Sequence, residues 1–251
     1  MNKIIVKNNI VSSYQDNTIK IENNIIKIVK DSDYEIEYID CDKVELIINI
    51  INSRVNIMES SFDNTLEIDN IYNINNGGVK INKFYTNEGV KEKIVVNLNK
   101  EKDYIYYNFS SITKGIEEYI MDINHNAKNT LSNISNKLVA LKNSKINFTI
   151  NSNVYKECNG SILEQNTRIV TMDKCDAKIQ PNMFIDLDDV EARHGSVIGT
   201  FKDDQIFYLM SKGISYNDTL KLLIKGYLLG NVMVNFDVRK KIIDIIDMYW
   251  R

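Results

Sequence analysis

Up to Gly199 the chain is a succession of short runs rich in isoleucine and valine, separated by polar residues. These runs include VELIINI, IVVNL, INFTI and MFIDL. Each has the length of a β-strand, and β-branched residues favour strands. No apolar stripe with the helical period is sustained here. The asparagines between runs suit turns, because asparagine tolerates left-handed backbone conformations. The pattern predicts a β-rich body, and a sandwich, a barrel and a β-helix all fit it.

The pattern changes near residue 200, after which helices are expected. Thr200 to Asp203 and Ser215 to Asp218 each place a hydroxyl three residues before an acid, as at helix N-termini. The first predicted helix would end at Gly213 and the second at Gly230. The expected apolar faces are Ile206, Phe207 and Met210, then Leu220, Leu223, Ile224, Tyr227 and Leu228, and, in a third helix from Asp237, Ile242, Ile245, Ile246 and Tyr249. We therefore expect a β body over residues 1–198 and a C-terminal helical domain over 199–251.

Composition excludes several classes of function. With 31 basic and 34 acidic side chains, the net charge of -3 gives no general attraction for nucleic acid or anionic lipid. No apolar run approaches the roughly 20 residues that span a bilayer, and the first residues lack the pattern of a signal peptide. We therefore expect a cytoplasmic protein with no nucleic-acid or membrane partner. Cys41, Cys158 and Cys175 form no CxxC pair, so the sequence indicates neither a disulfide framework nor a zinc finger.

Two stretches near the C-terminus carry a resemblance to a known family. PNMFIDLDDVEARHGSVIGTFKDDQIFYLMSKGIS, from Pro181, and LKLLIKGYL, from Leu220, resemble the C-terminal part of the SufB/SufD family. Proteins of this family are scaffolds of the SUF system of iron–sulfur cluster assembly. HNAKNTLSN, from His125, and QNTRIVTMDK, from Gln165, are also similar. The resemblance runs from His125 to Leu228, about half of the chain, and the chain is short for the family.

The resemblance implies a mainly β fold, a right-handed parallel β-helix capped by a small C-terminal α-helical domain. It also implies dimerisation through the β-helix, with a second copy or a SufB-like paralogue, and docking of a SufC-like ABC ATPase on the helical end. A cysteine desulfurase system would supply sulfur. The implied function is that of a scaffold or accessory subunit carrying a transient iron–sulfur cluster, with no tightly bound cofactor. Such a chain is not an enzyme, because the ATPase activity belongs to a partner.

His194 occupies the position of the family's signature histidine. Neutral imidazole is a suitable iron ligand, although a histidine bonded to backbone at a strand-to-helix corner is an equal alternative. Gly195 stands where SufB-like members carry a glutamate, and Gln165 to Arg168 lacks their sulfur-accepting cysteine. Ala192 replaces a cysteine that is common in SufD-like members. The chain is therefore SufD-like, with part of the cluster chemistry missing.

Cys175 is the second candidate cluster ligand. It precedes His194 by 19 residues, close to one coil of a β-helix, so the two could stack on neighbouring coils as a site for iron or a persulfide. A buried apolar role is the alternative, and it is the one expected for Cys41 and Cys158. The acids from Asp186 to Glu191 are expected at a solvated corner, with Phe184 pointing inward, rather than in a metal site.

The predicted ATPase-docking surface lies on the first two helices, because their aromatic and methionine side chains exceed what one packing stripe needs. It comprises Phe207, Tyr208, Met210, Ser211, Lys212 and Gly213, then Leu223, Ile224, Gly226 and Tyr227. Inward packing is expected for Phe207 and Leu223 even so. Two alternative functions stay open. One is a β-helix binding or regulatory protein that has lost cluster chemistry, and the other is a β-solenoid enzyme acting on carbohydrate, for which no clustered acids or aromatic platforms are evident in the sequence.

Overall fold

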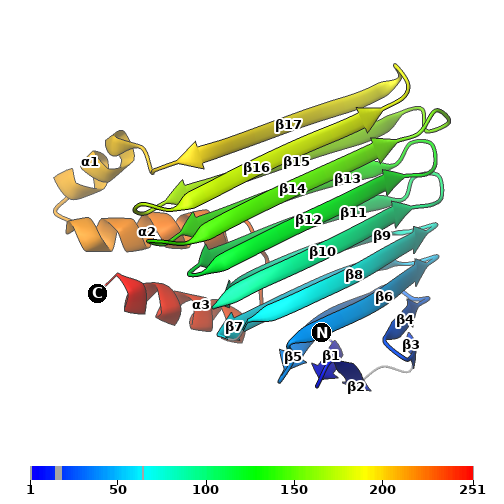
Figure 1. Cartoon of the computed structure of the whole chain (residues 1–251), viewed down its shortest axis with the longest axis horizontal. Helices are drawn as coiled ribbons and strands as arrows, with labels where there is room; N and C mark the ends of the chain where they lie inside the picture. Colours follow the sequence, from blue (N-terminus) through cyan, green and yellow to red (C-terminus); the bar gives the residue numbers. More distant parts are fainter. Residues whose placement is uncertain (1, 15–18, 64, 251) are drawn as a thin grey trace.

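The structure, a computed structural model, describes residues 2–14, 19–63 and 65–250, in which seventeen strands are followed by three helices (Figure 1). The strands are β1 (Asn2–Lys7), β2 (Ile10–Tyr14), β3 (Ile19–Glu22), β4 (Ile25–Ile28), β5 (Ser32–Ile39), β6 (Lys43–Ile51), β7 (Arg54–Asp63), β8 (Leu66–Asn75), β9 (Gly78–Asn87), β10 (Gly89–Leu98), β11 (Tyr104–Thr113), β12 (Ile116–His125), β13 (Leu131–Ala140), β14 (Lys145–Val154), β15 (Ser161–Thr171), β16 (Asp176–Ile185) and β17 (Val190–Gly199). The helices are α1 (Asp203–Ser211), α2 (Tyr216–Leu229) and α3 (Phe236–Tyr249).

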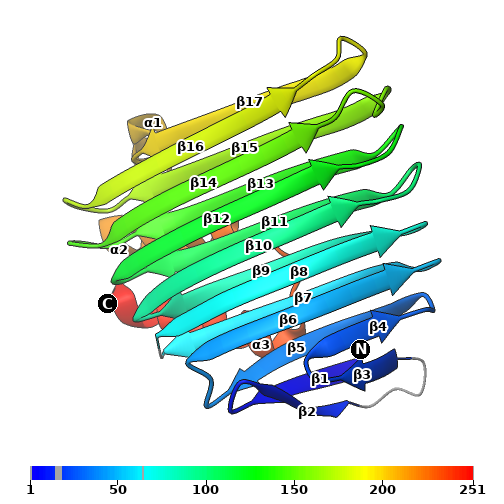
Figure 2. The same ribbon diagram turned by 45° about the vertical axis from the view of Figure 1, so that its right-hand side comes forward.

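The strands form two stacked sheets. From β4 onward, successive strands alternate between a nine-stranded and an eight-stranded sheet, and each pairs in parallel with the strand two places along (Figure 2). This is a parallel β-helix in which each coil supplies one strand to each sheet, and the fold class implied by the resemblance is confirmed. At the N-terminal end, β1 with β2 and β3 with β4 form antiparallel hairpins.

The interior between the sheets follows the alternation read from the sequence. In β14, for example, Ile146, Phe148 and Ile150 are buried while the residues between them face outward. Parallel register stacks such residues coil upon coil, so that the rings of Tyr119 and Phe148 lie 4.9 Å apart. One continuous apolar core results, and burial of this apolar area is the main stabilising term.

Asparagine serves both the turns and the outer face of the eight-stranded sheet. Asn52 and Asn76, at corresponding turns, have φ values of 51° and 63°, in the region that asparagine tolerates best after glycine. On the outer face, five stacked asparagines join neighbouring coils through side-chain amide bonds of 2.8–3.0 Å. They are Asn49, Asn73, Asn97, Asn124 and Asn153. The asparagine content therefore has a structural use along the whole β-helix.

Helices α2 and α3 cover the outer face of the nine-stranded sheet and do not cap the last coil, which corrects the expectation from the resemblance. Outward-facing Phe84 and Val139 of that sheet pack against Ile224 of α2 and Ile242 of α3 in a second apolar cluster. Ser110 Oγ donates a hydrogen bond of 3.0 Å to the carbonyl of Leu228. The helices are therefore attached along the side of the β-helix (Figure 1).

The predicted helix ends are partly confirmed. Ser215 caps α2, because its Oγ accepts the N–H of Asp218 at 3.2 Å, and Gly230 is the residue at which α2 ends. Gly213, with φ of 85°, follows the end of α1. The capping role predicted for Thr200 is wrong, since α1 begins at Asp203 and the residue before it makes no side-chain cap.

Candidate functional site

The last coil of the β-helix, made by β16 and β17, is open. Each of these strands is hydrogen-bonded to the β-helix on one side only. Their inward faces therefore lack the following coil that would cover them, and Ile198 of β17 is 46% exposed although its neighbour Ile169 in β15 is buried. Inward residues of β16, such as Ile179 and Met183, are partly exposed in the same way. The open coil is a shallow apolar surface with two free strand edges.

His194 lies on the inward face of this open coil. Its register partner in β15 is Gln165, which is 1% exposed and points into the interior, so His194 points the same way. The imidazole is exposed because, in the part of the chain that the structure describes, no further coil pairs with β17. The alternative of a histidine bonded at a strand-to-helix corner does not fit, because His194 sits in the middle of a strand. Its role as a cluster ligand stays a prediction.

The structure does not bring Cys175 and His194 together. Cys175 precedes β16, at the far end of that strand from the turn to β17, whereas His194 is four residues after the turn-side end of β17. The offset of six residues along the strands is about 20 Å, and Cys175 leads into β16 of the eight-stranded sheet, whereas His194 lies in the nine-stranded sheet. Partial burial, reinforced by the carboxylates of Asp176 and Asp173, raises the pKa of the Cys175 thiol. Cys175 is partly buried and packs against the main core. Its role as a cluster ligand stays a prediction, and His194 is not close enough to share that site.

The acidic turn between β16 and β17 is exposed, and within the described ranges no group of three or more His, Cys, Asp or Glu side chains could hold a metal ion. Leu187 in the turn and Val190 at the start of β17 pack against a small buried cluster of Val154, Cys158 and Leu163. The expectation that Phe184 points inward is wrong. It follows the outward alternation of β16 and is 57% exposed.

The second histidine, His125, is buried at the end of β12 among hydroxyl side chains, an arrangement that sequence reasoning missed. His125 Nδ1 is 2.7 Å from Thr130 Oγ1, and Nε2 is 2.9 Å from Ser132 Oγ. Burial lowers the pKa of His125 to about 4, which keeps it neutral. Cys158 is buried, as expected, and its thiol donates to the His125 carbonyl at 3.0 Å. Both ring nitrogens are occupied, so this histidine is structural. Its hydroxyl partners were visible only as the nearby threonine and serine of HNAKNTLSN.

A group of buried charges crosses the β-helix near its middle. Lys83 Nζ lies 2.9 Å from Glu59 and 2.8 Å from Glu92, and all three side chains are buried. The Tyr85 hydroxyl lies within hydrogen-bond distance of both carboxylates and can donate its one proton to either. Burial opposes the charge of Lys83, but the two carboxylates prevail and raise its pKa well above the ordinary value. Burial and the nearby Glu59 raise the pKa of Glu92. The residues come from three strands, and their spacing in sequence gives no signal for the contact.

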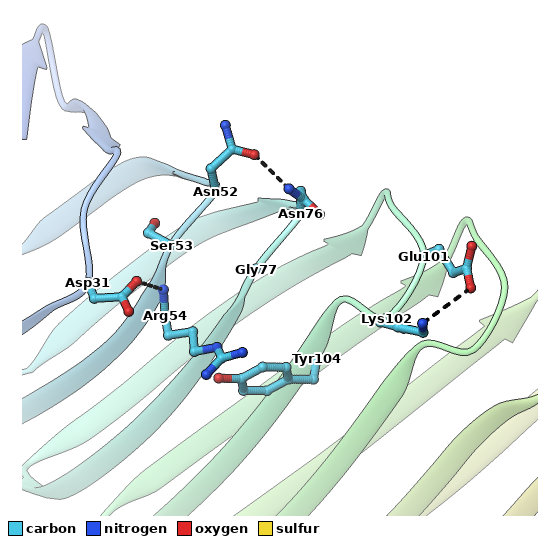
Figure 3. Close-up of a pocket in the computed structure, with 9 residues that line it drawn as sticks. All are labelled: Asp31, Asn52, Ser53, Arg54, Asn76, Gly77, Glu101, Lys102 and Tyr104. Atoms are coloured by element: carbon cyan, nitrogen blue, oxygen red, sulfur yellow. Dashed lines mark hydrogen bonds and ion pairs between the residues drawn. The ribbon is translucent and has the colours of Figure 1, made fainter.

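A surface hollow of about 450 Å³ lies along the turns that precede β5, β7, β9 and β11 (Figure 3). Tyr104 lies flat over Gly78, where a side chain would clash with its ring, and Arg54 extends beside it. The carboxylates here serve the turns: Asp31 accepts the Arg54 backbone N–H at 2.7 Å, and Glu101 accepts from Asn129 at 3.2 Å. The hollow supplies an aromatic ring with mixed charges, but both acids are already engaged.

The predicted docking residues divide between the surface and the interior. On α1, which has no buried residue, Phe207 is 73% exposed, so its expected inward packing is wrong. Tyr208, Met210, Ser211, Lys212, Gly213 and, on α2, Gly226 are also exposed. Ile224 is buried, while Leu223 and Tyr227 are partly buried. The Tyr227 hydroxyl donates to the Arg168 carbonyl at 2.6 Å, which fixes α2 to the β-helix. Only the α1 side of the set is therefore free to meet a partner.

Comparison with known proteins gives consistent matches. The family model described as SUF system FeS cluster assembly, SufBD core domain, matches residues 75–227, well beyond the segment noted from the sequence. An iron–sulfur cluster assembly SufBD family protein of Pyrococcus horikoshii is 32% identical over 31% of this chain and 18% of its own length. The iron–sulfur cluster assembly protein SufD of Bacillus subtilis is 32% identical over 34% of this chain and 20% of its own length. SufD of Escherichia coli is 34% identical over 27% of this chain and 16% of its own length. The matches thus span about a fifth of these relatives.

Proposed function

The chain belongs to the SufBD core family of the SUF iron–sulfur cluster assembly system, and from that membership we propose that it serves as a scaffold or accessory subunit on which a cluster is assembled. The observation that carries the proposal is the open last coil, which lies inside the matched segment and presents His194 on its inward face. The cluster is cargo that passes through the site. The chain itself turns over no substrate, and ATP is hydrolysed by a SufC-like partner in the cytoplasm.

Dimerisation is proposed to occur through the open coil. Long unpaired strand edges beside exposed apolar side chains invite pairing with another chain. The ten-residue strands β16 and β17 offer two such edges. A second copy, or a SufB-like paralogue, placed against them would continue the sheets and bury Ile198 together with His194.

Two adjacent residues test this interface. Ile198 and Val197 are similarly exposed, at 46% and 54%, but face inward and outward on the same strand. Ile198→Lys should raise the dissociation constant of the dimer at least tenfold, and Val197→Lys should change it much less. Sedimentation equilibrium of the wild type and both variants measures this. Equal effects, or a monomeric chain in the presence of its paralogue, would contradict the proposed interface.

His194 is proposed to bind iron of the nascent cluster across this interface. The coil around it supplies nitrogen and oxygen donors but no thiol, since Cys175 lies about 20 Å away along the strands. Sulfur ligands must then come from the opposite chain or from the desulfurase system. His194→Ala should leave stability unchanged, because the side chain is exposed, and should abolish complementation of a strain lacking this protein. Full complementation would remove His194 from the mechanism.

The ATPase is proposed to dock on α1. Phe207 and Tyr208 project from this helix, and a hollow lined by Tyr208, Leu209 and Leu223 lies between α1 and α2. Exposed aromatic side chains beside a hollow are typical of helix-docking contacts. Removal of residues 200–251 is an unsuitable test, because it would expose Phe84 and Val139 on the sheet.

A surface substitution is the cleaner test of docking. Phe207→Ser combined with Tyr208→Ser should abolish co-purification of the SufC-like ATPase while the thermal midpoint stays within a few degrees of the wild type. Met233, 82% exposed on the loop after α2, provides the control. Met233→Ser should retain the ATPase. If the double variant still binds it, the docking site lies elsewhere.

A binding subunit without cluster chemistry is the second candidate. It is favoured by Gln165, the coil neighbour of His194, which stands where a thiol would make a cysteine–histidine site. Anaerobic reconstitution with iron and sulfide separates the two. Visible absorbance that depends on His194 supports the scaffold, and no absorbance in any combination of partners supports the binding subunit.

A further inference from the structure

The buried side-chain amide of Gln165 has a hydrogen-bonded nitrogen and an oxygen without a partner among the described residues. Its Nε2 donates to Ser152 Oγ at 2.7 Å and to the backbone carbonyl of Asn182 at 3.4 Å. A carbonyl can only accept, so the amide nitrogen must lie on that side. Gln165 Oε1 is buried and finds no partner in the part of the chain that the structure describes. Buried acceptors are almost always satisfied, so this oxygen needs a donor.

His194 is the coil neighbour that can supply this donor. The two residues pair in register, with their strands about 4.8 Å apart, and both point inward. Within residues 2–14, 19–63 and 65–250 the His194 imidazole has no hydrogen-bond partner, and it is exposed. A rotation about its own side-chain torsions would bring an N–H towards Gln165 Oε1. The unpartnered acceptor of Gln165 and the unbonded imidazole of His194 are therefore complementary.

We propose that Gln165 is a positioning residue for His194. Its Oε1 accepts the N–H of one ring nitrogen, while Ser152 and the Asn182 carbonyl hold the amide in place. A neutral imidazole then keeps a single tautomer, since the bonded nitrogen carries the proton. The other ring nitrogen, unprotonated, faces the open end of the coil and is free to bind a metal cation. Partners of this kind commonly orient metal-binding histidines.

The hydrogen bond stands on the geometry alone, whereas the binding of iron at the second nitrogen rests on the proposed function. The two parts have separate measurements. The tautomer is read from imidazole ¹⁵N resonances of the full-length protein at pH about 8, where an ordinary histidine is neutral. The chain has only two histidines. His125, bonded through both nitrogens, serves as an internal reference for folding.

The wild type should show one dominant His194 tautomer, with widely separated ring nitrogen resonances. Gln165→Met should average them, and so should Gln165→Leu, which removes the same acceptor with a different shape. Gln180, exposed on the outer face of β16, gives the control, and Gln180→Met should have no effect. Iron(II) titration under argon should show affinity falling by about 10- to 100-fold in Gln165→Met.

An averaged tautomer in the wild type, or a single tautomer that survives in Gln165→Met, overturns the proposal. If Gln165→Met disturbs the His125 resonances and so fails to fold, Gln165→Leu decides, because a single tautomer that survives there also overturns the proposal. A Gln165-dependent tautomer without iron(II) binding leaves the positioning role standing and removes the iron-binding role of His194.

Discussion

Individual buried ionisable residues should have large effects on the stability of this β-helix, and Glu117 is one of them. Its Oε2 accepts from the hydroxyls of Tyr119 and Thr113, each at 2.8 Å, and from Ser111 at 3.2 Å. No cation pairs with it within the described ranges. Burial raises the pKa of Glu117 to about 7, and the hydroxyl donors only partly oppose this shift. The folded protein therefore holds a proton that the unfolded chain releases near pH 4.5.

This difference predicts a pH-dependent loss of stability. A carboxyl whose pKa is raised on folding contributes fully below its unfolded pKa, and the contribution is lost as pH rises towards about 7. Between pH about 4.5 and 7 the loss is about 3 kcal/mol. Glu117→Gln should remove this pH dependence, so that the stability of the variant rises relative to that of the wild type as pH increases. Urea unfolding across this range measures the difference, and a constant difference would contradict the assignment.

Replacing Lys83 should destabilise the protein strongly, in contrast to the stabilisation expected on replacing Glu117. Removing one partner of a buried ion pair leaves uncompensated charge, which costs about 3–5 kcal/mol. Lys83→Met should therefore lower the free energy of unfolding by that amount at neutral pH. Lys80, three residues earlier on the outer face with its ammonium 5.5 Å from the Tyr106 ring, is the matched control. Lys80→Met should cost at most about 1 kcal/mol. Similar losses in both variants would show that the buried charges are not coupled.

At the scale of the element, local rules succeeded where the cause is local. Ser215 and Gly230 were identified as helix ends because capping involves residues within one turn. Thr200 satisfies the same pattern but failed, because the chain leaves β17 in extended form and α1 begins only at Asp203. The exposure of Phe207 could not be read from the helical period either, since α1 makes its main contacts with α2.

The two hydroxyls give a direct test of this distinction. Ser215→Ala should destabilise the protein by about 1 kcal/mol, the usual loss for an N-cap. Thr200→Ala, which matches the same sequence pattern without the hydrogen bond, should cost a few tenths of that amount. Urea unfolding of both variants decides, and equal losses would mean that Ser215 contributes nothing specific.

At the scale of the whole molecule, the sequence determined the strands but not how they wind. Alternation within a strand is local, whereas the coil length is set by turns that differ along the chain. Gln165 and His194 pair although they are 29 residues apart. A residue only 19 positions before His194, such as Cys175, therefore falls on the opposite sheet. The ion pair between Lys83 and Glu59, which lie on neighbouring coils, was invisible for the same reason.

The molecule has two unlike ends and one covered side. Antiparallel hairpins finish the N-terminal end, α2 and α3 cover one sheet, and the C-terminal coil with His194 is left open. This asymmetry is the basis for proposing a β-helix partner at the open coil and an ATPase at α1. The two proposed contacts use separate surfaces and should be separable by substitution.

Native mass spectrometry of the tagged full-length chain, purified anaerobically from its own host, tests this account most directly. The expected result is a complex containing a SufC-like ATPase and a β-helix partner, either a second copy or a SufB-like paralogue. Ile198→Lys should lose the β-helix partner and keep the ATPase, whereas Phe207→Ser with Tyr208→Ser should do the reverse. A chain recovered alone as a monomer, or a complex unaffected by both sets of substitutions, would contradict it.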